Sequence, residues 1–192
     1  MTPKREIGQQ QYIANYPSRE RVKGMGRMLA EAGGSLPDDF DIDEISWVTP
    51  RIGITDFEGS IEAVAKGYQI LNVAGELESI CPGVDTIAIE PYHGKVKETL
   101  DEIADLINVF LSRDKNFDIP PTKVVVNCAM GIERSPLAVA WYLHTYSGFP
   151  WSEAPDDLTL DEAYDIVRQA RPVAVERRYW IEGYDDTEDY SR

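Results

Sequence analysis

The chain has 192 residues, of which 43% are hydrophobic, and it contains 14 glycines and 12 prolines. This length and composition favour one folded domain and exclude collagen-like and intrinsically disordered chains. Nineteen basic side chains against 34 acidic ones give a net charge of -15, which repels nucleic-acid backbones and anionic membrane surfaces. We therefore expect neither a nucleic-acid partner nor a membrane partner.

Apolar runs and cysteines bear on location and on metal binding. The longest uninterrupted apolar stretch covers residues 136–143, whereas a membrane span needs about 20 residues. The charged opening MTPKRE is followed by no apolar signal region, so we expect a cytoplasmic protein. Two cysteines and two histidines are too few for a disulfide framework or a cysteine zinc site, so we expect no metal.

Residues 1–44 are interpreted as an N-terminal extension. The first 34 residues hold six basic and three acidic side chains, so we expect this basic segment to lie against the acidic remainder of the chain. A short amphipathic helix is predicted at 18–32, where apolar residues recur at helical spacing. These residues are Val22, Met25, Met28, Leu29 and Ala32. Residues 185–192 form an acidic tail.

Between these ends, short apolar runs alternate with helical patterns from residue 45 onward. This alternation predicts one compact α/β domain with a mostly parallel central sheet flanked by helices. The predicted strands cover residues 46–52, 69–73, 86–89 and 123–127. The predicted helices cover 95–112 and 134–146, and a third begins at Thr159, whose spacing to Glu162 is that of a capping box.

Residues 128–135, with the sequence CAMGIERS, join the last predicted strand to the helix at 134–146. A tight loop between a strand and a helix N-terminus forms a concavity of backbone N–H groups that favours an anion. The thiolate of Cys128 at such a site is stabilised and becomes a nucleophile. Arg134 can hold two oxygens of a phosphate with its planar guanidinium, Gly131 allows a close turn, and Ser135 can donate a hydrogen bond to the sulfur.

This loop resembles the C-x5-R signature of the cysteine-dependent protein phosphatases. The compact dual-specificity phosphatases are the most similar group, and their fuller pattern is H-C-x-x-G-x-x-R-S. The resemblance continues in family order through residues 47–76, 86–107, 134–143 and 159–172. It implies a phosphatase-like catalytic domain at 45–184.

The resemblance also implies a reaction and a role for each matching residue. Cys128 would attack phosphorus to form a phosphocysteine, Arg134 would hold the phosphoryl oxygens, and Ser135 would assist hydrolysis of the intermediate. The remaining substrate-binding positions are Asn127, Ala129, Met130, Gly131, Ile132 and Glu133. The expected partner is a phosphoprotein substrate, and no cofactor is implied.

The general acid that protonates the leaving oxygen is usually an aspartate in this family. Placing residues 100–107 on the family helix without gaps puts Glu90 at that position. Asp85 and His93 are the alternatives, and a solvated carboxylate without a catalytic role is the other interpretation of Glu90.

Two further positions depart from the family pattern. Asn127 stands where the family has a histidine; an amide can still bond the loop backbone but carries no positive charge, so we expect a less stabilised thiolate and slower turnover. Glu133 beside Arg134 would oppose highly anionic substrates if it faced the pocket. We expect Glu133 to point outward or to pair with a basic side chain.

The sequence therefore leads to three hypotheses. The first is a protein phosphatase acting on phosphotyrosine, phosphoserine or phosphothreonine, which the presence of both Cys128 and Arg134 favours. The second is a catalytically impaired phospho-binding module, which Asn127 and the uncertain acid favour. The third is a thiol redox sensor, for which Cys81 is the one other cysteine available.

Overall fold

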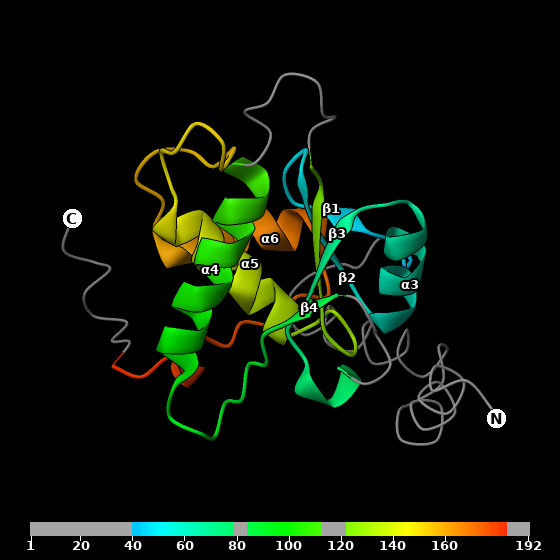
Figure 1. Ribbon diagram of the computed structural model, residues 1–192. Coiled ribbons are helices and arrows are strands. Elements are labelled where there is room, and N and C mark those ends of the chain that lie inside the picture. Colours follow the sequence, from blue (N-terminus) through cyan, green and yellow to red (C-terminus); the bar gives the residue numbers. More distant parts are fainter. Residues whose placement is uncertain (1–39, 79–83, 113–121, 184–192) are drawn as a thin grey trace.

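The structure is a computed structural model that describes residues 40–78, 84–112 and 122–183. The predicted helix at 18–32, Cys81 and the acidic tail lie outside these ranges. Five strands form one sheet in the order β1-β2-β5-β3-β4, in which β1 is antiparallel to β2 and all other neighbours are parallel (Figure 1). The strands are β1 (Ser46–Trp47), β2 (Ile52–Thr55), β3 (Gln69–Asn72), β4 (Asp85–Thr86) and β5 (Val124–Asn127). The predicted α/β fold with a mostly parallel sheet is confirmed.

Helices cover both faces of this sheet. Helix α3 lies on one face, and α4, α5 and α6 lie together on the other (Figure 1). The helices are α3 (Phe57–Ala65), α4 (Val96–Ser112), α5 (Arg134–Thr145) and α6 (Leu160–Ala170), with 3₁₀ helices η1 (Gly75–Leu77) and η3 (Arg178–Trp180). The predictions for α4, α5 and the start of α6 are confirmed within a residue or two.

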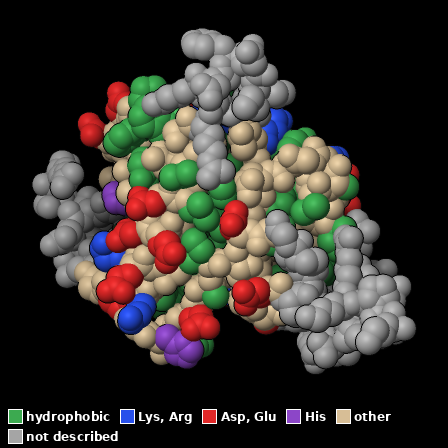
Figure 2. Space-filling view, viewed as in Figure 1, with side chains coloured by type: hydrophobic (Ala, Val, Ile, Leu, Met, Phe, Trp, Pro, Cys, Tyr) green, Lys and Arg blue, Asp and Glu red, His purple; other side chains and the backbone are tan. Residues whose placement is uncertain are grey.

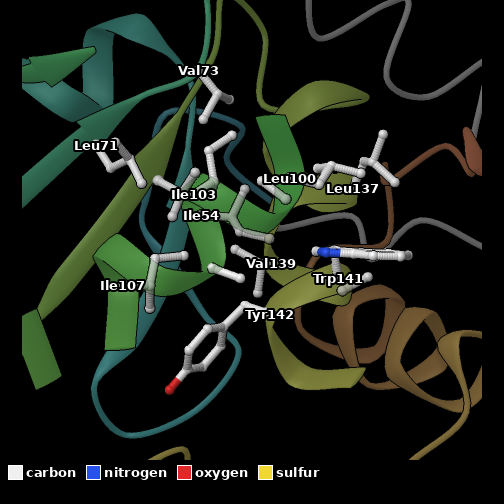
Figure 3. Packing of buried hydrophobic residues seen from close by; sticks show 14 of the residues in the cluster. Ile54, Leu71, Val73, Leu100, Ile103, Ile107, Leu137, Val139, Trp141 and Tyr142 are labelled. Atoms are coloured by element: carbon white, nitrogen blue, oxygen red, sulfur yellow. The ribbon is translucent and has the colours of Figure 1, made fainter. Parts of the chain in front are cut away.

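The core explains why α5 is central. Its residues from Ser135 to Leu143 are all buried, so it packs against the sheet and against α4 and α6 at once. Figure 3 shows Val139 of α5 among Ile54, Leu71 and Ile103, which come from β2, β3 and α4. On the opposite face Val125 packs with Ile70 and Ala63. Successive β5 residues thus point to opposite faces, and the sheet is buried on both sides.

Local signals fix where these helices begin. Thr159 Oγ1 accepts a hydrogen bond from the Glu162 amide at 3.2 Å, and Glu162 Oε2 accepts one from the Thr159 amide at 2.9 Å. This is the predicted capping box. Helix α4 keeps its apolar side on the core, and acidic side chains gather over its outer side (Figure 2).

The single strand predicted at 46–52 is wrong, because the chain reverses inside it to form a hairpin of β1 and β2. Thr49 Oγ1 accepts hydrogen bonds from the amides of Arg51 and Ile52, at 3.3 and 3.1 Å. The intervening Pro50 has no amide to donate to a strand ladder. Three consecutive turn residues therefore override the strand propensity of the segment.

The strand predicted at 86–89 is shorter than expected and starts one residue earlier. Only β4, at Asp85–Thr86, pairs regularly with β3. Beyond it the chain keeps two isolated bonds, from the Ile87 amide to the Asn72 carbonyl and from the Ile89 amide to the Val73 carbonyl. The segment follows the sheet edge past its carboxyl end without forming a ladder. Within the described parts of the chain, no helix is long and apolar enough to cross a membrane.

Candidate active site

The cysteine loop, residues 128–135, connects the carboxyl end of β5 to the N-terminus of α5. Parallel strands end together on this edge of the sheet, which is where α/β folds place their sites. Gly131 has a φ of +64°. A Cβ there would lie 2.4 Å from Arg171 Nη2 and 2.7 Å from the Thr55 carbonyl oxygen. Conformation and close approach together therefore require glycine at this turn.

Four consecutive carbonyl groups of the loop, those of residues 129–132, are bonded to the surrounding body of the protein. The carbonyl oxygens of Ala129 and Ile132 accept from backbone amides outside the loop, at 3.4 and 2.8 Å. Those of Met130 and Gly131 accept from the Arg171 guanidinium, at 3.4 and 2.5 Å. The C=O and N–H groups of one trans peptide unit point in opposite directions, so a carbonyl that points into the body turns the amide of the following residue the other way. The Gly131 amide, which shares a peptide unit with the Met130 carbonyl, accordingly donates to Cys128 Sγ at 3.2 Å. This arrangement is a backbone nest of the kind that binds anions.

The thiol of Cys128 lies inside this nest and is almost fully buried. Its Sγ accepts hydrogen bonds from the Gly131 amide at 3.2 Å and from Ser135 Oγ at 3.3 Å. Burial raises the pKa of the Cys128 thiol, but the positive charge of Arg134 and the bonds from Ser135 and the loop amides outweigh it, and the net pKa is lowered. A lowered pKa increases the thiolate fraction at neutral pH.

Arg134 forms a two-bond ion pair with Glu76 of η1. Nη1 donates to Oε2 at 2.8 Å and Nη2 donates to Oε1 at 2.5 Å. This planar pairing fixes the orientation of the guanidinium beside the loop. Sequence reasoning missed Glu76. The available signal was its place just after β3, because the end of β3 lies next to the end of β5 in a parallel sheet.

Glu133 pairs with Arg177, as one of the two expectations for it required. Arg177 Nε donates to Glu133 Oε1 at 3.0 Å, and Nη2 donates to the same oxygen. The Arg177 guanidinium also lies 5.8 Å from the Tyr179 ring and 5.6 Å from the Trp180 ring. The carboxylate beside Arg134 is therefore neutralised by a cation that aromatic rings help to hold.

Arg171 is a buried cation beneath the loop that sequence reasoning did not single out. It is fully buried, and besides the loop carbonyls it donates to the Ile42 carbonyl oxygen at 2.9 Å and to Ser46 Oγ at 3.1 Å. It therefore ties the segment before β1 to the loop. The signal for it was its place in the Arg-Pro pair that follows α6.

Two buried carboxyl groups accompany Arg171. Asp56 caps α3 by accepting from the Gly59 amide at 2.8 Å, and Asp43 lies close to it. Burial, together with the nearby Asp43, raises the pKa of Asp56 to about 7, against the lowering effect of the Gly59 bond. Burial lowers the pKa of Arg171 to about 10. Asp56 therefore keeps its proton under mildly acidic conditions.

We expect the contribution of Asp56 to stability to fall between about pH 4 and pH 7. In this window the unfolded chain has lost the Asp56 proton and the folded chain still holds it, so raising the pH favours unfolding by up to ~1.4 kcal/mol per pH unit. Above pH 7 both states are ionised and this slope ends. Asp56→Asn keeps an oxygen to cap α3, and its stability relative to the wild type should rise from pH 5 to about pH 7 and then stay constant to pH 8.

Urea unfolding of both proteins across this range measures the effect. Glu58→Gln, an exposed change in the first turn of the same helix, is the control and should show no such trend. A difference between Asp56→Asn and wild type that does not change with pH would contradict this account.

Of the three candidate acids, the structure places Glu90 and His93 nearest to the carboxyl edge of the sheet. The bond from Ile89 to Val73 carries the chain past the end of β3, and Glu90 Oε2 then contacts His93 Nδ1 in the following turn. Asp85 Oδ2 instead accepts from Gln69 Nε2 at 3.1 Å, at the opposite end of β3. The geometry therefore favours Glu90 and His93 over Asp85.

Asn127 is buried beneath the loop. Its Nδ2 donates a long bond, 3.5 Å, to Asn72 Oδ1, and its own Oδ1 has no hydrogen-bond partner among the described residues. The Asn127 amide is thus directed to Asn72, and it does not make the bond to the loop backbone that an amide at this position could form. The expectation of a less stabilised thiolate stays a prediction. A buried acceptor without a partner costs about 1–3 kcal/mol. Among residues 40–78, 84–112 and 122–183 there is no cluster of three side chains that could hold a metal ion.

Comparisons with known proteins bear on the fold. No family model matches the chain, and no curated protein sequence matches it. Solved structures do. Tk-PTP in its active form is 22% identical, with a TM-score of 0.52 over 71% of this chain and 90% of that one. Human DUSP28 is 18% identical, with a TM-score of 0.52 over 69% of this chain and 84% of that one.

A third solved structure is the human tyrosine phosphatase-like serine/threonine/tyrosine-interacting protein. It is 15% identical, with a TM-score of 0.53 over 72% of this chain and 91% of that one. Identities this low show a shared fold only. Taken with the sheet order and the cysteine loop, they establish that this chain has the fold of the cysteine-dependent protein phosphatases of the compact dual-specificity type.

Proposed function

We propose that the protein is a cysteine-dependent phosphatase that hydrolyses phosphotyrosine, phosphoserine or phosphothreonine in proteins. The observation that carries the proposal is the environment of Cys128, whose Sγ accepts bonds from Gly131 and Ser135 in the loop that also holds Arg134. A thiolate at the centre of a backbone nest has both a nucleophile and the donors that a phosphoryl group requires.

The reaction has two steps. The Cys128 thiolate forms a bond to phosphorus while the bond from phosphorus to the leaving oxygen breaks, and that oxygen takes a proton from Glu90. A water molecule then attacks the phosphocysteine with ionised Glu90 accepting its proton. This releases inorganic phosphate and restores the thiolate, to which the Ser135 hydroxyl donates. Arg134 and the loop amides hold the phosphoryl oxygens in both steps.

The charges near the loop are consistent with a singly phosphorylated side chain as substrate. Glu76 holds Arg134, and Glu133 is held by Arg177. These two ion pairs balance in charge, so they supply no excess positive charge for a substrate that brings several phosphates. We propose phosphoproteins as partners on this basis, and a cytoplasmic location stays a prediction.

A phospho-binding module without turnover is the second candidate. It is favoured by Asn127, which brings no positive charge to the thiol. One structural neighbour is described as phosphatase-like and as an interacting protein. Such a module would keep the nest and Arg134 but release no phosphate.

One assay separates the two candidates. The full chain is incubated with p-nitrophenyl phosphate and with a phosphotyrosine peptide in the presence of a chelator, beside Cys128→Ser. Phosphate release by the wild type and not by Cys128→Ser supports the hypothesis that the protein is an enzyme. Binding of the peptide by both proteins without any release supports the module.

We expect Glu90→Gln to slow phosphopeptide hydrolysis far more than hydrolysis of an aryl phosphate with a very acidic phenol. The peptide has a poor leaving group that needs a proton, whereas the acidic phenol departs without one. Steady-state rates on both substrates from pH 5 to pH 9 measure this.

Asp85→Asn and His93→Ala are the matched variants for this test. Asp85→Asn should behave like wild type, because its side chain is bonded to Gln69 at the other end of β3. If His93→Ala produces the selective loss and Glu90→Gln does not, the acid is His93 and our placement of Glu90 is wrong.

A further inference from the structure

A segment near the carboxyl end of the described residues contacts both loops of the candidate active site. We call residues 175–182 the C-terminal strap and residues 90–95 the acid loop. The strap contains η3, which lies beside the lower end of α4 in Figure 1. The acid loop leads directly into the same end of α4. The strap therefore passes close to the segment that carries Glu90 and His93.

The strap is fixed to the cysteine loop and to the core. The Val175 amide donates to the Ile132 carbonyl oxygen at 2.8 Å. The Arg177 guanidinium holds the Glu133 carboxylate. Ile181 is buried in the main core cluster. These three anchors hold the strap in a defined position relative to the cysteine loop.

Glu182, the last residue of the strap, binds the first turn of α4. Its Oε1 accepts a hydrogen bond from the Val96 amide at 2.9 Å, and its Oε2 accepts one from the Lys97 amide at 3.0 Å. The first amides of a helix have no partner within it. The two bonds lower the pKa of the Glu182 carboxyl, and a carboxylate also suits the positive end of the helix dipole. Gly94 and Lys95, which precede α4, have no side-chain oxygen to cap it.

The acid loop itself is exposed. The side chains of Glu90 and His93 are 57% and 70% exposed, and the bond between them joins two residues of the same loop. The loop begins after the Ile89 amide, which donates to the Val73 carbonyl oxygen, and it ends at α4. Few buried contacts make a segment easy to displace. The position of the acid loop therefore depends on the anchors at its two ends.

We propose that Glu182 is a positioning residue that holds the acid loop in place relative to Cys128. This rests on the proposed function, because it assigns Glu182 to the reaction described above. The acid must lie within hydrogen-bond reach of the leaving oxygen, and a displacement of about 1 Å can lower a rate about 100-fold. Through Arg177 and Glu182 one short strap holds both the cysteine loop and the acid loop. The same argument applies whichever of Glu90 and His93 donates the proton.

The kinetic test compares Glu182→Ala with Glu98→Ala. Glu98 is an exposed carboxylate in the same first turn of α4, so its removal takes the same charge from the same helix end. We expect Glu182→Ala to lower kcat on the phosphotyrosine peptide by roughly tenfold, with KM unchanged. Hydrolysis of an aryl phosphate with a very acidic phenol, which departs without a proton, should stay within about twofold of wild type.

Two comparisons complete the kinetic series. Glu98→Ala should leave both substrates within about twofold of wild type. Glu182→Gln keeps one oxygen that can accept a bond from the α4 amides, so it should lose less activity on the peptide than Glu182→Ala does.

Hydrogen exchange of the backbone amides tests the contact without reference to activity. Peptides covering residues 90–100 should exchange faster in Glu182→Ala than in the wild type and in Glu98→Ala. Peptides covering the cysteine loop should exchange as in the wild type, because the bonds of Val175 and Arg177 remain.

Four results would overturn the proposal. A full rate on the peptide, or an equal loss on both substrates, would mean that Glu182 does not act through the acid. Unchanged exchange over residues 90–100 would mean that Glu182 does not hold the acid loop. An equal effect of Glu98→Ala would assign the change to charge alone. If the wild type releases no phosphate, the proposed function fails and the role of Glu182 in catalysis fails with it, and faster exchange in Glu182→Ala would then identify a structural cap only.

Discussion

Cys128→Ser is expected to reduce turnover of p-nitrophenyl phosphate by about four orders of magnitude or more, as loss of a nucleophile does in other enzymes. A serine hydroxyl at this position is not ionised at neutral pH, whereas the thiol has a lowered pKa. The measurement is phosphate release over hours at high enzyme concentration.

The same variant should still bind an oxyanion, because the donors that surround the sulfur are untouched. The Gly131 amide, the Ser135 hydroxyl and Arg134 all remain in place. Titration calorimetry with inorganic phosphate should give a Kd within about threefold of wild type. Retained turnover in Cys128→Ser would contradict the role of Cys128 as the nucleophile. Loss of phosphate binding would contradict the role of the loop amides as an anion site.

Arg134→Lys should lower kcat/KM by two or more orders of magnitude, comparable to the loss of another donor to a developing anion. A lysine ammonium keeps the charge but cannot form two parallel bonds, either to Glu76 or to a phosphoryl group. Initial rates on p-nitrophenyl phosphate and a phosphotyrosine peptide measure the loss.

Glu76→Gln is the matched variant for this prediction, since it leaves the guanidinium intact and weakens only its partner. We expect a loss of about tenfold, because the guanidinium is then less well oriented. Activity of Arg134→Lys within threefold of wild type would contradict the role of Arg134. A larger loss in Glu76→Gln than in Arg134→Lys would assign the main function to Glu76.

Most of the fold could be predicted because its signals are local. The amphipathic stripe of α4, the apolar residues of α5 and the Thr159 capping box each lie within one segment. The hairpin at β1 and β2 was missed because a turn of Thr49, Pro50 and Arg51 lies inside a run that otherwise has strand character. A turn within an apolar run is a local competition that composition alone does not decide.

The contacts around the site were harder to predict, because they join residues far apart in the sequence. The cysteine loop could be found from its own spacing, whereas Glu76 meets Arg134 across 58 positions and Arg177 meets Glu133 across 44. Both pairs depend on which strands and loops are neighbours. Which strands and loops lie side by side is known only once the order of the strands in the sheet is known, and no short stretch of the sequence shows that order.

The hydrogen bond from Arg171 to the Ile42 carbonyl has a consequence for shortening the chain. Ile42 also packs on Ile132 and Val173 and is almost fully buried. A recombinant chain cut immediately before β1 would keep every helix and strand within residues 40–78, 84–112 and 122–183, yet it would remove Ile42 together with Asp43. The buried guanidinium would then lose an acceptor and a neighbouring carboxyl group, which is costly for a charge without solvent. The smallest stable fragment therefore begins several residues before the first strand.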